Sequence, residues 1–190
     1  MFLQFSLEHA ALGARRGVAH QLNGLGDVAR FRNDLPLAAE HYQRAVTIFE
    51  SIGVPFDAAI ALTNLGIVAR DAGKFAEASS AFARAVTVSE RIHYPYLLIG
   101  AKVNWAAAEA LAGNRDAAET LLRDSLAELD TTGFVDPDYA LPLELIGAER
   151  ATAGDTAQAA LLLERARDMW AELKRETDVA RTQQLLDSLG

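Results

Sequence analysis

Apolar residues recur at intervals of three and four along most of the chain, the spacing that places them on one face of an α-helix. The pattern repeats after 40 positions. Residues 22–46 and 62–86 both begin with Leu-x-x-Leu-Gly-x-Val-Ala-Arg and both end with Arg-Ala-Val. Similarity at a fixed offset of this size is typical of stacked helical repeats. No stretch of the chain has the alternating pattern that predicts a β-strand.

Weaker copies of the same unit divide the rest of the chain. We expect a single domain over residues 1–190 that begins halfway through a repeat and ends with a capping helix. Its predicted parts are a half-repeat helix (1–14), four repeats (17–52, 56–92, 96–132 and 137–173) and a C-terminal capping helix (177–189). The last helix has one apolar and one polar face, as the end of a stack requires.

Capping and turn residues mark the predicted boundaries between the first and second helices of each repeat. Asp34 and Asp155 stand where a side-chain oxygen would cap a second helix. Gly73 supplies a residue that readily adopts the left-handed conformation between two helices. Pro55 and Pro95 lack a backbone N–H and therefore favour the start of a new first helix.

The repeats resemble the tetratricopeptide repeat family, whose helix–turn–helix unit has about 34 residues. The matching residues of the second repeat are Leu62, Leu65, Gly66, Ala78, Phe82 and Ala85. The first and fourth repeats match at equivalent positions, and the third is the weakest copy. Glycine inside a helix costs about 1 kcal/mol relative to alanine, so Gly26, Gly66 and Gly147 indicate close approach of the paired helix. The residues expected opposite them are Ala38, Ala78 and Ala159.

The resemblance implies an all-α fold, a right-handed superhelix of antiparallel helix pairs, and a function in protein–protein interaction. The period of 40 to 41 residues is longer than the usual repeat. Units of this length resemble those of large regulatory proteins, including bacterial signal-transduction ATPases, kinases and adaptor proteins. We therefore expect a non-catalytic binding module that is a fragment of a larger bacterial signalling or regulatory protein.

In this family the first helix of each repeat lines the concave surface, so the resemblance implies a partner-binding groove there. The predicted groove residues are Asn23, Asp27, Arg30, Asn64, Ile67, Arg70, Asn104, Leu111 and Leu145. The N-terminal half of this groove is polar with two arginines, and the C-terminal half is mostly apolar. This gradient favours an amphipathic, extended peptide as the ligand.

Two pairs of groove residues have alternative roles. Asn64 and Asn104 occupy equivalent positions in adjacent repeats, where their amides could bridge to the main chain of a peptide. Each amide could equally satisfy its own helix or face water. Arg30 and Arg70 could bind a carboxylate of the partner or could pair with aspartates close by in the same helix.

Composition narrows the classes of function. The net charge of −8 argues against binding of nucleic acid, which needs a basic face. No apolar run approaches the ~20 residues needed to span a membrane, and the N-terminus lacks the basic segment of a signal peptide. We therefore expect a cytoplasmic location and a protein or peptide partner. There is no cysteine, and the four histidines lack metal-ligand spacing, so we predict no catalytic site, no metal and no cofactor.

Self-association is the alternative function. The predicted half-repeat at the N-terminus has no first helix to cover it, so some of its apolar surface would be exposed. We expect any homo-oligomer to form through this N-terminal end, with Phe2 and Phe5 in the contact.

Overall fold

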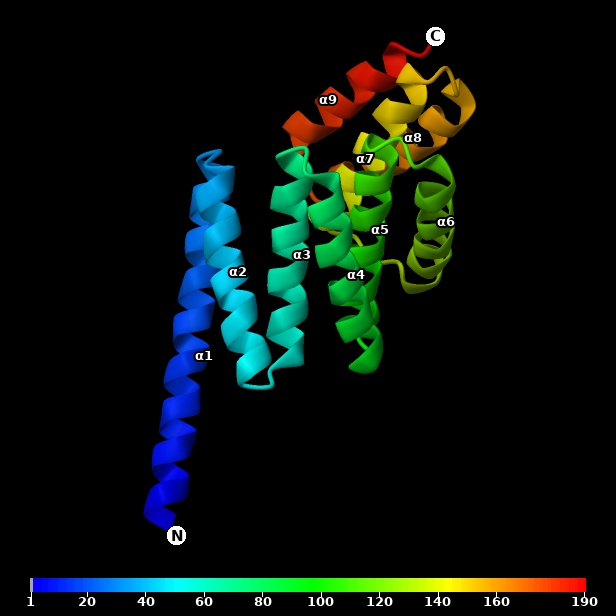
Figure 1. The fold of residues 1–190 in the computed structure, drawn as a ribbon. Helices are drawn as coiled ribbons and strands as arrows, with labels where there is room; N and C mark the ends of the chain where they lie inside the picture. Colours follow the sequence, from blue (N-terminus) through cyan, green and yellow to red (C-terminus); the bar gives the residue numbers. More distant parts are fainter. Residues whose placement is uncertain (1) are drawn as a thin grey trace. The chain divides into compact units, whose positions relative to one another are not determined.

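The computed structural model describes the backbone from Phe2 to Gly190 and the side chains from Ala10 onward. Within these residues there are nine helices and no strand, so the predicted all-α class is confirmed (Figure 1). The helices are α1 (Phe2–Phe31), α2 (Leu35–Ser51), α3 (Pro55–Asp71), α4 (Phe75–Arg91), α5 (Pro95–Leu111), α6 (Arg115–Thr132), α7 (Pro137–Thr152), α8 (Thr156–Glu172) and α9 (Glu176–Asp187). The predicted repeat starts at residues 56, 96 and 137 lie within one residue of the starts of α3, α5 and α7.

The predicted caps and turns are confirmed. The Asp34 carboxylate accepts a hydrogen bond from the backbone N–H of Leu37, and the Asp155 carboxylate accepts one from that of Gln158, each at 3.2 Å. Both bonds satisfy a donor at a helix start that has no partner within the helix. Gly73 lies between α3 and α4 with a φ of 73°, the left-handed conformation that favours glycine.

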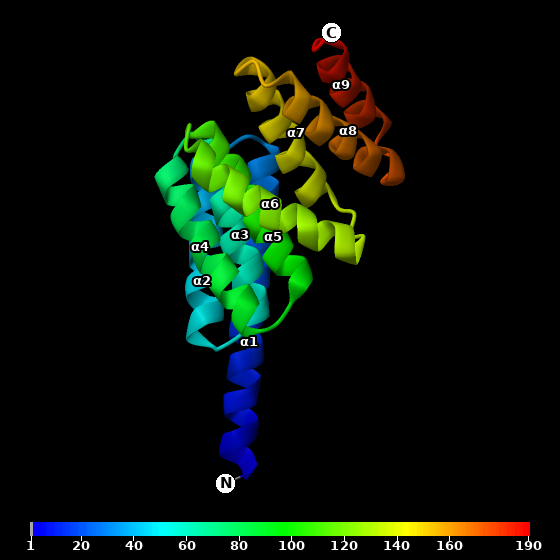
Figure 2. The ribbon, with the colours of Figure 1, turned by 90° about the vertical axis from the view of Figure 1, so that its right-hand side faces the viewer.

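Helix α1 differs from the sequence prediction, which places a break between a half-repeat ending at residue 14 and a repeat starting at residue 17. The helix is continuous over 30 residues. No proline interrupts it, and neither Gly13 nor Gly17 adopts a positive φ, so nothing in the backbone ends the helix there. Figures 1 and 2 show its N-terminal part extending beyond α2. The side chains of Phe2 and Phe5, which we expect in a homo-oligomer contact, lie outside the described residues.

The chain divides into two compact units, residues 1–98 and 99–190, with the boundary inside α5. In the first unit, α1 pairs with α2 and α3 pairs with α4, while α3 also packs on α2. Val68 of α3 is buried against Ala38 and Tyr42 of α2, and Leu65 packs beside it. The small alanine side chains bring the helix backbones close, and the large rings fill the remaining space.

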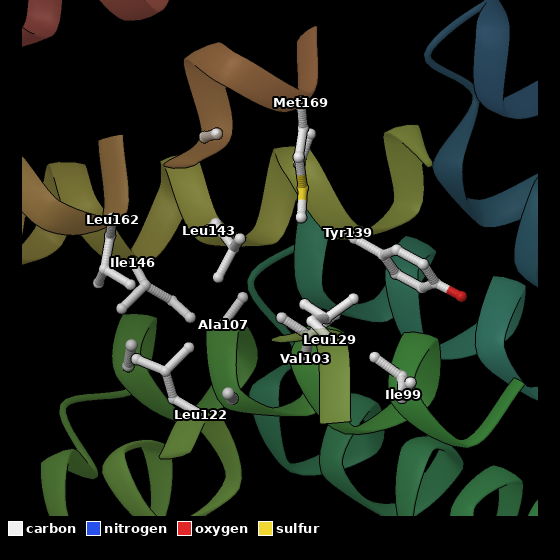
Figure 3. Packing of buried hydrophobic residues seen from close by; sticks show 14 of the residues in the cluster. Ile99, Val103, Ala107, Leu122, Leu129, Tyr139, Leu143, Ile146, Leu162 and Met169 are labelled. Carbon is white, nitrogen blue, oxygen red and sulfur yellow. The ribbon is translucent and has the colours of Figure 1, made fainter. Parts of the chain in front are cut away.

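The second unit has its own core, built from α5, α6, α7 and α8. Figure 3 shows Leu143 and Ile146 of α7 directed toward Ala107 of α5 and Leu122 of α6. Helix α9 covers α8 and places Val179 against the same core. Burial of these side chains is the main favourable term in folding such a unit.

Three of the helix pairs contain a contact between a glycine and a large side chain, and in the first two this contact corrects the sequence prediction. A Cβ added to Gly26 would lie 2.6 Å from Cε1 of Tyr42, and one added to Gly66 would lie 2.6 Å from Cε1 of Phe82. The glycines were expected opposite alanines, but the nearest side chain is the ring four residues further along the second helix. A ring is flat and stacks on a bare helix backbone, so the glycine is needed to admit it.

The third and fourth repeats contain variants of this contact. A Cβ on Gly147 would lie 2.8 Å from Cγ of Leu163, and 3.4 Å from the carbonyl oxygen of Ala159. The third repeat has Ala106 at the glycine position and Leu122 at the ring position. Alanine in the first helix is therefore combined with a leucine rather than a ring in the second helix.

We predict that Gly66→Ala lowers the free energy of unfolding by about 1–3 kcal/mol, because the new methyl group overpacks against the Phe82 ring. Adding Phe82→Leu, which copies the combination in the third repeat, should recover part of the loss. Gly24→Ala is the matched control, since nothing lies within 4 Å of its Cβ, and its higher helix propensity should raise stability slightly. Urea unfolding measures the stability of all three variants. Equal effects of Gly66→Ala and Gly24→Ala would contradict the predicted role of the contact between Gly66 and Phe82.

Ser89 is the one residue of α4 whose polarity conflicts with its surroundings. Its position corresponds to Phe49 of α2 and Leu129 of α6, and all three side chains are buried. The Ser89 hydroxyl has no hydrogen-bond partner among the described residues. By contrast, the buried Ser125 hydroxyl donates to the Leu121 carbonyl oxygen at 2.7 Å. A buried hydroxyl without a partner costs free energy relative to water.

Ser89→Ala should therefore raise the free energy of unfolding by about 1 kcal/mol, because it removes an unsatisfied buried group. Ser125→Ala removes a satisfied hydroxyl at an equally buried position and should leave stability unchanged or lower it. Thermal and urea unfolding compare the two variants with the wild type. A loss of stability in Ser89→Ala would show that its hydroxyl is well solvated or bonded in solution.

Candidate functional site

The predicted groove in the first unit is a polar face formed by α1 and α3. The Asn64 side-chain amide lies 3.4 Å from the Asn23 side-chain oxygen, so the structure brings these two predicted residues together. Nearer the start of both helices, the Arg16 guanidinium binds the Asp57 carboxylate, at 2.9 Å from Nε and 2.8 Å from Nη2. These contacts hold the two first helices in register along the face.

The other predicted residues of the first unit differ in their exposure and in whether their polar groups already have partners. Asp27 is exposed, and its carboxylate accepts a 2.7 Å hydrogen bond from the Tyr42 hydroxyl. Arg30 is half-buried and makes no ion pair with any described residue. Ile67 and Arg70 are each only 3% exposed. Nε and Nη2 of Arg70 both bind the Asp71 carboxylate, at 3.0 and 2.9 Å, so Arg70 has the structural role weighed above.

Asn104 does not face a ligand. It is 1% exposed, and its side-chain amide donates to the carbonyl oxygens of Gly100 and Asp138, both at 2.9 Å. The first bond lies within α5, and the second links α5 to the start of α7. Asn104 is therefore a structural residue that joins two first helices, because its short amide reaches carbonyl groups on both.

Two predicted residues of the second unit come together at an apolar hollow. The hollow, with a cavity volume of about 550 Å³, is lined by Leu111, Arg115, Leu145, Ala148, Glu149, Thr152 and Ala153. Leu111, at the C-terminal end of α5, is 39% exposed, and Leu145 of α7 is half-buried. Arg115 and Glu149 lie 3.5 Å apart at the rim. We call this feature the Leu111–Leu145 hollow.

A buried ionic cluster around Glu144 was missing from the predicted site. Glu144, on α7, accepts hydrogen bonds from Trp170 Nε1 at 3.0 Å, Thr182 Oγ1 at 2.6 Å and Arg181 Nε at 2.6 Å. Burial by itself raises the pKa of the Glu144 carboxyl, but the hydrogen bonds from Arg181, Thr182 and Trp170 outweigh it and lower that pKa. The Glu144 carboxylate in turn raises the pKa of Arg181. The cluster fixes α9 to α7 and α8.

A second missed feature is a groove between the second helices α2 and α4, over α3. It has a cavity volume of about 490 Å³ and an apolar floor that includes Leu35, Leu65 and Val68. Two basic residues, Lys74 and Arg84, also line the groove. The small residues Ala72, Ala76, Ser80 and Ala81 leave this space open, and their clustering in the sequence is the signal that could have indicated it.

The residues that the structure describes include no cluster of histidine, aspartate and glutamate that could hold a metal ion. None of the described helices combines the length and the hydropathy needed to cross a membrane.

Helix pairs repeated every 40 residues define a helical-repeat protein. Residues 18–91, which form its first two repeats, match the tetratricopeptide repeat family model. The match covers the first two repeats, which are also the most similar to each other. No curated protein matches the chain.

Among the 54 matching chains of known structure is a Rap protein complexed with Competence and Sporulation Factor. The TM-score is 0.76 at 12% sequence identity, and the likeness covers 92% of this chain. The present chain spans about half of that protein, 52% of its length. At this identity the likeness concerns the fold alone, and it extends the helical-repeat architecture beyond the part matched by the family model.

The Glu144 cluster predicts a specific dependence of stability on pH. Because the folded-state pKa lies below the value of 4.5 for an unperturbed carboxyl, the stabilisation by Glu144 is complete above that value. It is lost as the pH falls through the lower folded-state pKa. Glu144→Gln should lower the free energy of unfolding by about 2 kcal/mol at neutral pH. It should also make the free energy of unfolding fall less steeply as the pH is lowered. Urea unfolding between about pH 3 and pH 6 tests this, with the exposed Glu172→Gln as control; parallel curves for all three proteins would contradict it.

Proposed function

We propose that this protein is a non-catalytic protein-interaction module that binds an extended segment of a partner protein along its first helices. The tetratricopeptide repeats support this function, since repeat arrays of this kind present extended binding surfaces. The 40-residue period resembles that of large regulatory proteins and supports a place in bacterial signalling or regulation, within a larger protein.

The Leu111–Leu145 hollow carries the proposal. It combines an exposed leucine with the short side chains of Ala148, Thr152 and Ala153, so an apolar side chain can enter and displace water. The ion pair between Arg115 and Glu149 at the rim can bind polar groups that flank this anchor. An apolar anchor surrounded by polar contacts is the usual composition of a binding hot spot.

The polar face of the first unit is a second, separate surface on which we propose that polar groups of a partner bind. Asn23 and Asn64 are half-buried and their contact is long at 3.4 Å, so either amide can exchange it for a hydrogen bond to a peptide main chain. Arg16 is 52% exposed in its side chain although it binds Asp57, and it can interact with an acidic residue of the partner. Asn104 and Arg70 are left out of the proposed site because both are buried.

A selection of peptides from a random display library against the full chain tests the function, followed by titration calorimetry with the enriched peptides. We expect sequences with one apolar anchor residue. Leu145→Glu should weaken binding by about tenfold or more, as for a central contact residue. Leu161→Glu is the matched control, because Leu161 of α8 is 56% exposed and lies outside the hollow.

Asn64→Ala should weaken the same peptides by a smaller factor, about threefold, which corresponds to the loss of one hydrogen bond. Equal affinities of the wild type, Leu145→Glu and Leu161→Glu would show that the hollow is not the binding site. Failure to enrich any peptide would contradict the proposed peptide-binding function itself.

A further inference from the structure

Among its described side chains, helix α1 carries an open face that includes no charged residue and is exposed except at the half-buried Gly24. The members of this open face of α1 are Ala10, Gly13, Ala14, Gly17, Val18, Gln21, Gly24, Leu25, Val28 and Phe31. At 100° per residue they lie on one side of the helix, opposite the side that packs on α2. Val18, Leu25 and Val28 are 48%, 49% and 47% exposed, and Phe31 is 93% exposed. A contiguous apolar face of this size marks an interaction surface.

The repeats show what this face can bind, because the same residue types are buried elsewhere in the chain. Leu25 and Val28 correspond to Leu65 and Val68 of α3 after the 40-residue offset. On α3 these two residues pack against α2. The open face of α1 thus has the surface that another first helix uses to cover a neighbouring helix, and α1 has no such neighbour in the first unit.

Three glycines on the open face give a second, independent indication that another helix packs on it. Nothing lies within 4 Å of a Cβ added at Gly13, Gly17 or Gly24. A glycine inside a helix is unfavourable relative to alanine, and the contact with Tyr42 that explains Gly26 is absent for these three. Bare backbone on the outside of a helix allows a second helix to approach closely.

We propose that the open face of α1 binds the open face of a second copy of this chain, with the two helices antiparallel. The small residues Ala10, Gly13, Ala14 and Gly17 occupy the N-terminal half of the face, and the large residues Leu25, Val28 and Phe31 occupy the C-terminal half. Antiparallel pairing places small residues opposite large ones along roughly 32 Å of helix. The face is thereby complementary to itself, as a two-fold interface requires.

The polar residues in and beside the face agree with the same arrangement. Gln21, the one polar member, lies midway between Ala14 and Val28, so it meets its counterpart at the two-fold axis, where each amide can donate to and accept from the other. Arg16 and Asp27 flank the face on one side, at nearly equal distances in sequence from Gln21. Antiparallel pairing therefore sets each arginine alongside the partner's aspartate, whereas parallel pairing puts these residues on opposite sides of the interface and forms no such pair.

Helix α9 carries polar residues at two positions where α3 carries the surface that packs on its second helix. In α9, Gln183 and Asp187 occupy the positions of Leu62 and Gly66 in α3, and they bind each other at 2.8 Å. These polar residues replace the surface on which a further second helix would pack. The Leu111–Leu145 hollow contains no residue of the open face, so peptide binding there can be tested separately from association through α1.

Light scattering on the full chain tests the dimer. The mass should rise from 20.5 kDa toward twice that value with concentration, and a mass that stays at 20.5 kDa up to about 100 µM would overturn the proposal. Leu25→Glu should raise the dimer dissociation constant by about thirtyfold or more, while Leu161→Glu should not change it. Gly24→Leu should also dissociate the dimer without lowering the melting temperature, a result that a purely structural role for Gly24 would not give.

Disulfide trapping tests the direction of the two helices, because the natural chain contains no cysteine. An equimolar mixture of Ala14→Cys and Val28→Cys chains should form a cross-linked dimer on mild oxidation, and each variant alone should form little. Leu161→Cys is the control for random collisions. Cross-linking of each variant alone, at the level of the mixture, would overturn the antiparallel arrangement.

Discussion

The contact between a glycine of the first helix and a large side chain of the second helix sets the spacing of the helix pairs in the first, second and fourth repeats. At Gly26 and Gly66 an aromatic ring lies where a Cβ would be, so the two backbones are as close as the thickness of the ring allows. The third repeat reaches a similar arrangement with Ala106 and Leu122, both buried. The close spacing is what allows small residues such as Ala38 and Ala78 to fill the interior without cavities.

The helices could be predicted from the sequence because their signals are local. The caps at Asp34 and Asp155, the turn at Gly73 and the starts at Pro55 and Pro95 each depend on a few neighbouring residues. The continuity of α1 was missed, because two glycines in a helical pattern suggest a break that only a proline or a left-handed residue would enforce.

The roles of the polar residues could be predicted only in part, because a side chain's environment depends on the neighbouring helix. Asn64 and Asn104 stand at equivalent positions, yet Asn64 contacts another side chain and Asn104 is buried against two carbonyl groups. Arg70 and Glu144 look solvated in a single-helix projection, but each is buried with an oppositely charged partner. Leu111 and Leu145 were predicted from the family's register of first-helix positions, and both line the same hollow.

The bonds that join one repeat to the next are short in sequence. The longest described above, from Arg16 to Asp57 and from Asn23 to Asn64, span 41 residues, and no segment has to return from a distant part of the chain. A chain with this topology closes small loops, which favours rapid folding. Its stability is close to a sum of terms for single repeats and for their immediate neighbours. Damage to one repeat can therefore open that repeat locally while the rest of the array remains folded.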